Sequence, residues 1–197
     1  MAVATEAPVS EVILHLPLTD DQFAELCTNN PDLRFEYTCT GDLIIMPPTS
    51  SDTGERNASL TADFVIWNRS TGAGRVFDSS MGFILPNGAK RSPDVSWISH
   101  ERWDALSDRE RQGLARICPD FVLELRSPTD RLGSLQEKMQ EYLDNGARLG
   151  WLIDPTDRVV YVYCPGKEME RFDAPIEISG EPVLPGFGLR LATAWPT

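Results

Sequence analysis

The sequence predicts an α/β or α+β fold, in which a central mixed β-sheet is flanked by helices and by peripheral β-hairpins. Two observations support this expectation. A short apolar run of strand length, Phe121–Leu125, is followed by a segment with helical periodicity over residues 134–146. The dipeptide Asn87-Gly88, placed between two further strand-like runs, is a strong hairpin signal. Elements of this kind pack as layers around one hydrophobic core.

The chain has 197 residues, of which 41% are hydrophobic, enough for one domain with a real core. We expect an N-terminal arm over residues 1–17, with a short extended piece at 12–16, and a single domain over residues 18–197. The expected helices are 20–28, 53–69, 100–106, 108–114 and 134–146. The expected strands are 33–38, 42–46, 75–78, 82–85, 93–98, 121–125, 148–154, 158–163, 168–172 and 189–191.

Local signals support the helices individually. Thr19 and Gln22 have the spacing of a capping box at the start of the first helix. In the second, Leu60, Phe64 and Trp67 recur on one stripe, as in a helix with one buried face. We therefore expect about three substantial helices, together with two short ones.

Net charge and composition limit the classes of partner. The formal charge of −12 opposes non-specific binding to nucleic acid, which depends on Lys and Arg at the phosphates. A nuclease with this charge would need a local basic strip or a bridging metal. No apolar run is long enough to span a membrane, and the first residues do not resemble a secretory signal. The four cysteines are scattered, so we expect reduced thiols and a cytoplasmic location.

Several types of catalytic site are disfavoured by missing motifs. The chain has only two histidines, His15 and His100, and no G-x-S-x-G motif, which argues against a Ser-His-Asp triad. It has no G-x-x-x-x-G-K-[ST] phosphate loop, and its glycine pairs lack the third glycine of a dinucleotide-binding fingerprint.

What remains is a set of carboxylates with one lysine. Glu124 lies inside the apolar strand, and Lys138 lies on the inward face of the next helix, where a charge is costly to bury alone. Asp94 and Glu36 lie on or beside two other expected strands. Two converging carboxylates suit Mg²⁺ or Mn²⁺, which prefer oxygen ligands and retain several waters. A neighbouring lysine can orient an attacking water or offset developing negative charge.

Five segments resemble one family in order and spacing. They are F-E-Y-T-C-T-G-D-L-I-I-M-P-P-T at 35–49, R-S-P-D-V-S-W at 91–97, F-V-L-E-L-R-S-P-T-D at 121–130, L-Q-E-K-M-Q-E-Y at 135–142 and G-W-L-I-D-P at 150–155. On these motifs the chain resembles the Uma2-type endonucleases of the PD-(D/E)XK superfamily. The resemblance runs from about residue 33 to about residue 191.

The resemblance implies a restriction-endonuclease-like fold and divalent-metal-dependent hydrolysis of DNA phosphodiester bonds. Asp94 matches the acid of the P-D motif, and Glu124 matches the D/E position; these two would be the metal ligands. The superfamily usually has a lysine at position 126, where this chain has Arg126. The family commonly places its lysine on the following helix, which Lys138 matches. Glu36 matches an acid of the family's first hairpin.

Each of these residues also has a structural interpretation. Glu124 can pair with Arg126, two positions along the strand, and Tyr142 is more often a core residue than a catalytic one; both Arg126 and Tyr142 are candidate accessory residues. Asp120, which follows Pro119, has the spacing of a strand-end acid. If the site is structural, the chain is an inactive nuclease-fold interaction protein, with Trp103 and Trp195 as exposed contacts.

Two further possibilities remain open. A third function is that of a phosphodiesterase acting on small molecules. A homodimer is expected only by analogy with related nucleases.

Overall fold

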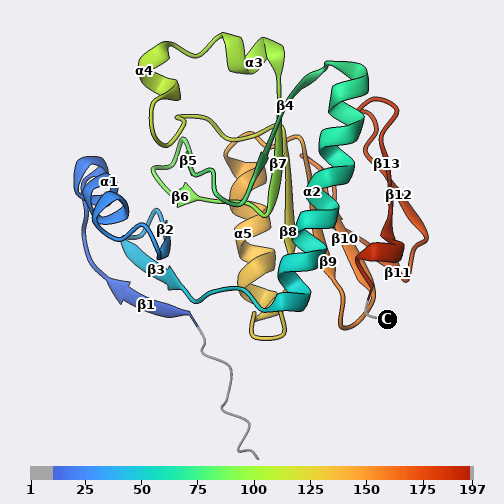
Figure 1. The fold of residues 1–197 in the computed structure, drawn as a ribbon, viewed down its shortest axis with the longest axis horizontal. Helices are drawn as coiled ribbons and strands as arrows, with labels where there is room; N and C mark the ends of the chain where they lie inside the picture. The colour runs from blue at the N-terminus through green and yellow to red at the C-terminus, as the bar shows by residue number, and fades with distance from the viewer. Residues whose placement is uncertain (1–10, 196–197) are drawn as a thin grey trace, which may run out of the picture.

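The computed structural model describes residues 11–195, which form two main β-sheets, a small third sheet, five α-helices and one 3₁₀ helix (Figure 1). The helices are α1 (Asp20–Asn29), α2 (Ser51–Thr71), α3 (His100–Asp104), α4 (Asp108–Arg111), α5 (Leu132–Asp144) and η1 (Leu191–Thr193). The strands are β1 (Val12–His15), β2 (Arg34–Tyr37), β3 (Asp42–Met46), β4 (Gly74–Asp78), β5 (Phe83–Ile84), β6 (Lys90–Arg91), β7 (Val95–Ser99), β8 (Phe121–Leu125), β9 (Leu149–Asp154), β10 (Val159–Tyr163), β11 (Glu170–Asp173), β12 (Glu177–Ser179) and β13 (Gly188–Arg190). No helix within residues 11–195 is both long and apolar enough to cross a bilayer.

The central sheet is mixed, as expected. Its strand order is β11-β10-β9-β8-β7-β4, and only β8 and β9 run parallel. Every residue of these two strands is buried, because layers cover both faces of the sheet. Near-continuous apolar sequence is typical of strands in that position.

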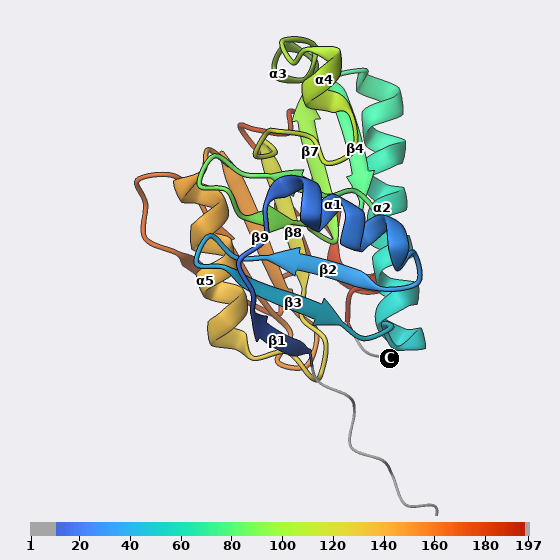
Figure 2. The same cartoon turned by 90° about the vertical axis from the view of Figure 1, so that its left-hand side faces the viewer.

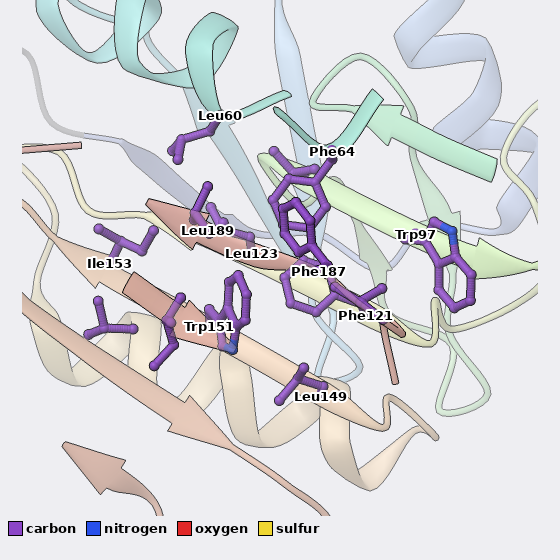
Figure 3. Close-up of a cluster of buried hydrophobic side chains, with 14 of the residues drawn as sticks. Leu60, Phe64, Trp97, Phe121, Leu123, Leu149, Trp151, Ile153, Phe187 and Leu189 are labelled. Carbon is purple, nitrogen blue, oxygen red and sulfur yellow. The ribbon is translucent and has the colours of Figure 1, made fainter. Parts of the chain in front are cut away.

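The two faces of the central sheet are covered by different elements (Figure 1). On one face, α2 and the small β12-β13 sheet pack against alternate residues of β8, with the rings of Phe64 and Phe121 stacked at 5.0 Å (Figure 3). On the other face, α5 packs against Val122 through Met139 and Tyr142. Side chains alternate along a strand, so Glu124 has the parity of Val122 and lies on the α5 face.

The first sheet has the order β1-β3-β2-β6-β5 and is covered by α1. Phe23 of α1 packs against Phe35 and Tyr37 of β2, and the Thr19–Gln22 capping box is confirmed by both of its hydrogen bonds. The extended piece expected at residues 12–16 is β1, which pairs with β3. Figure 2 shows this sheet and α1 in front of the central strands.

The predicted pairing of strands 82–85 and 93–98 is wrong. The Asn87-Gly88 turn exists, but it joins β5 to β6 in the first sheet, whereas β7 pairs with β4 and β8 in the central sheet. Pro93 separates β6 from β7 because it has no N–H to donate to a ladder. The chain therefore changes sheets between Arg91 and Val95.

Two smaller expectations are corrected. Trp103 is buried rather than exposed, and Trp195 is half-buried against the core on the α2 face. In addition, β12 was not expected, because its three residues lie in a Pro- and Gly-rich stretch with a weak pattern.

Candidate active site

A cavity of about 790 Å³ lies between the first sheet and the end of the central sheet, and Glu36, Asp94, Glu124 and Lys138 all line it. They come from different elements: Glu36 from β2, Asp94 from the residue before β7, Glu124 from β8 and Lys138 from α5. The structure thus brings together all four residues singled out in the sequence. The volume is in the usual range for a small-ligand site.

Lys138 connects two of these carboxylates. Its Nζ lies 2.8 Å from Oε1 of Glu36 and 2.8 Å from Oε1 of Glu124. Tyr142, four residues further along α5, donates a hydrogen bond from its hydroxyl to the same Glu124 oxygen at 3.0 Å. Residues four apart share a helix face, which explains why both side chains reach Glu124. Tyr142 is therefore both a core residue and a partner of the site.

The charges of this cluster do not balance. Burial is the largest influence on Glu124 and raises its pKa to about 7; Lys138 opposes this rise, and the neighbouring Asp94 and Glu36 add to it. Burial acts in the same direction on Glu36, but Lys138 and Arg91 outweigh it and hold its pKa at about 2. For Lys138, burial is outweighed by Glu124 and Glu36, which raise the pKa of its ammonium group. Glu124 is thus the carboxylate that the cluster leaves least stabilised.

Asp94 is held by two hydrogen bonds. Its Oδ2 accepts from the backbone N–H of Leu125 at 2.8 Å, and its Oδ1 accepts from Nδ2 of Asn57 at 2.8 Å. Burial raises its pKa despite these contacts and the charge of Lys138. The Oδ1 atom of Asn57 is buried and has no hydrogen-bond partner. The carboxylate is thus oriented, while a second oxygen beside it remains unsatisfied.

Asn57 was not anticipated, although a signal was present. It lies on α2 at positions three and seven before Leu60 and Phe64, and so on the stripe that faces the core. Like Lys138 on α5, Asn57 is a polar side chain on the inward stripe of a helix, where it is costly to bury without a partner.

Arg91 and Glu141 were also missed, and they extend the charged cluster. Arg91 lies 3.0 Å from Glu36 through Nη1, and its Nε donates to Glu141 at 2.6 Å. The backbone N–H of Ser92 donates to Glu36 at 2.9 Å. Glu141 lies outside the apolar stripe of its helix, and Arg91 of the first sheet reaches it there.

Arg126 takes no part in this cluster. The alternative in which Glu124 pairs with Arg126 does not hold: the Arg126 guanidinium pairs with Asp154 and lies 4.0 Å from Asp157, and Arg126 does not line the cavity. Beyond the end of β8 the chain no longer alternates as a strand, so spacing by two does not keep both side chains on one face.

The cavity residues fit a divalent cation with few protein ligands. Within residues 11–195 no three His, Cys, Asp or Glu side chains are arranged around a common metal position. Mg²⁺ commonly uses only one or two carboxylates and keeps its waters. Asp94 and Glu124 supply such a pair, and the unsatisfied amide oxygen of Asn57 lies beside Asp94. Acidic side chains on the cavity wall outnumber basic ones by seven to three, an excess that a cation would offset.

Buried carboxylates and a lysine from a mixed sheet and its covering helix thus meet at one cavity. The chain matches the model of the Uma2 family, described as "putative restriction endonuclease", over residues 20–193, and it belongs to that family. Its fold is similar to the crystal structure of a "putative nuclease belonging to DUF820" from Anabaena variabilis. The two are 23% identical with a TM-score of 0.74, and the similarity covers 91% of this chain and 98% of the other. No curated protein matches the chain.

Proposed function

We propose that this protein is a divalent-metal-dependent nuclease that hydrolyses phosphodiester bonds of DNA. The observation that carries the proposal is the convergence of Asp94, Glu124 and Lys138 on one cavity in a chain of the Uma2 family.

Each side chain has a distinct role in this proposal. Asp94 and Glu124 hold Mg²⁺ or Mn²⁺, which when bound polarises a phosphoryl oxygen and lowers the pKa of bound water. Lys138, kept protonated by two carboxylates, donates hydrogen bonds that orient the attacking water. Glu36 keeps Lys138 in position, and Asn57 keeps Asp94 in position. Tyr142 orients Glu124 through its hydroxyl.

The test begins with metal binding, because a negative nuclease assay can reflect the wrong substrate. Calorimetric titration of Mn²⁺ should show saturable binding to the wild type and none to Asp94→Ala. Asp104→Ala, at an exposed aspartate of α3, is the matched control and should bind as the wild type does. A nuclease assay on DNA with Mg²⁺ or Mn²⁺ follows, in which Asp94→Ala should be inactive. Equal Mn²⁺ binding by the wild type and Asp94→Ala would contradict the proposed ligand set.

The rival interpretation, an inactive interaction protein, loses two of its supports. Its structural ion pair between Glu124 and Arg126 does not form, and Trp103 is not exposed. The acidic charge of the chain remains in its favour. It predicts wild-type behaviour for Asp94→Ala in every assay, so the same experiment separates the two.

We also propose a cytoplasmic location. It is supported by the four cysteines, Cys27, Cys39, Cys118 and Cys164, all of which are free thiols. A homodimer remains a prediction from analogy.

A further inference from the structure

The cavity has an apolar patch beside its charged cluster. In the register of the first sheet, Ile13 of β1 lies opposite Ile44 of β3, which in turn lies opposite Glu36 of β2. These three side chains share one face of the sheet, and all line the cavity. The patch consists of Ile13, Ile44, Met46, Pro47, Pro48 and Leu135. It therefore meets the charged cluster at Glu36.

The cavity wall offers one basic side chain outside an ion pair. Lys138 and Arg91 are bound to carboxylates, whereas Arg34 forms no ion pair within residues 11–195 and donates only to the carbonyl of Ser79, at 2.9 Å. Arg34 and Asp94 line the same cavity. A phosphate close to Asp94 would thus have Arg34 as its cationic partner.

The rest of the surface is poorly suited to a DNA duplex. A duplex presents about one negative charge per 1.7 Å, and proteins bind it by neutralising many phosphates. Here at least half of the 18 basic residues already form ion pairs with acids of the same chain: Lys90, Arg91, Arg102, Arg116, Arg126, Lys138, Arg148, Arg171 and Arg190. The net charge is −12.

We propose that the cavity takes one unpaired nucleotide, so that the substrate is a single strand or a frayed strand end rather than a continuous duplex. The base packs on the apolar patch, and its phosphate lies between Arg34 and the acids Asp94 and Glu124. Enzymes that act on an unpaired base hold it in a snug pocket between aromatic or apolar side chains. A cavity of about 790 Å³ is large enough for one nucleotide. This inference rests on the proposed nuclease function.

The test is fluorescence anisotropy with a labelled single strand and a duplex of the same length and sequence, each in EDTA and in Ca²⁺. The wild type should bind the single strand at least roughly tenfold more tightly than the duplex, because base packing contributes only when the base is unpaired. Equal affinity for the two, or no binding of the strand under either condition, would overturn the inference.

Matched variants test whether the base binds at the apolar patch and the phosphate near Arg34. Ile13→Glu should weaken single-strand binding about tenfold, since it places a charge on the apolar patch. Ile66→Glu, at a comparably exposed isoleucine of α2, should not: Ile13 is 56% exposed and Ile66 is 65% exposed. Arg34→Gln should also weaken binding, whereas Arg69→Gln, near the end of α2, should leave it unchanged. Equal losses from Ile13→Glu and Ile66→Glu would contradict the proposed base position.

Cleavage of the same oligonucleotides in Mn²⁺ separates the two proposals. If the strand is bound but never cut, the nuclease proposal fails and the binding mode stands. If the duplex is cut as fast as the single strand, the nuclease proposal stands and the inference about the substrate fails.

Discussion

Two buried acids, Asp120 and Glu124, lie near the two ends of β8. Their neighbours carry opposite charges. Asp120 precedes the strand and lies among donors: its Oδ2 accepts from the backbone N–H of Ser99 at 2.9 Å, and its Oδ1 lies 3.1 Å from Arg102 and 3.6 Å from Arg148. Glu124 lies near the other end of the strand and has two acids, Asp94 and Glu36, among its neighbours.

The difference shows how the same residue type can serve structure or function. An acid surrounded by cations and N–H groups stabilises the fold in which it is buried. An acid placed beside other acids costs stability, and sites of this kind are retained where a ligand or a reaction needs them. Asp120 also lies outside the cavity that Glu124 lines. We therefore assign Asp120 to the fold and Glu124 to the site.

The largest expected effect is on stability at Asp120. Asp120→Ala leaves the Ser99 N–H without its acceptor and Arg102 without its partner, and should lower the free energy of unfolding by about 3 kcal/mol. Urea denaturation followed by far-UV circular dichroism measures this. A loss below about 1 kcal/mol would show that solvent replaces the carboxylate. The conclusion that Asp120 stabilises the fold would then be wrong.

A smaller effect, on activity rather than stability, is expected at Lys138. Lys138→Met removes the donor that the proposal assigns to the attacking water and should slow DNA cleavage by roughly 10²-fold or more. Mn²⁺ binding, measured by calorimetry, should persist because the two carboxylates remain. Arg126→Gln is the control at the position where the superfamily usually has its lysine. If Arg126→Gln slows cleavage as much as Lys138→Met, the assignment of the lysine role is wrong.

The smallest effect is the pH dependence of stability at Glu124. The pKa of Glu124 is raised from an ordinary value of 4.5 to about 7, so its contribution to stability is fully present below pH 4.5 and is lost as the pH rises through 7. Glu124→Gln does not titrate. In EDTA, the mutant should therefore gain stability relative to the wild type between pH 4.5 and pH 8.

Urea denaturation across this pH range measures the gain. Glu36→Gln should instead show a nearly constant loss of stability over this range, because the pKa of Glu36 is lowered to about 2 and its contribution is lost only as the pH falls below 4.5. Parallel pH profiles for Glu124→Gln and the wild type would show that the pKa of Glu124 is not raised in the folded protein.

The positions of these acids and of Lys138 could be predicted from the sequence, for a physical reason. Periodicity reports which face of its own strand or helix a residue occupies, and so it identified Glu124 in the sheet and Lys138 on the inward face of α5. The strand-end interpretation of Asp120 came from its position beside the same apolar run. The bounds of β8 and β3 were also predicted correctly, since each is a mostly apolar run with polar residues or a turn beside it.

What periodicity cannot report is which element covers a face. The sequence of α5 does not reveal that Arg91 reaches Glu141 from another sheet, so Glu141 was not among the expected site residues. The separation of β6 from β7 was missed for the same reason, since it depends on partners far away in sequence. Arg126 was misassigned because strand parity was extended one residue beyond the strand.

The passage of the chain from one sheet to the other has a consequence for how this protein can tolerate changes in length. Arg91 contacts Glu36 in the first sheet, and Asp94 is held by Leu125 in the central sheet, with only Ser92 and Pro93 between them. Three residues span at most about 11 Å, so this short segment limits the distance between the cavity residues of the first sheet and those of the central sheet. Insertions can be accommodated at the Asn87-Gly88 turn, but one added residue after Arg91 would shift Asp94 out of alignment with Glu124.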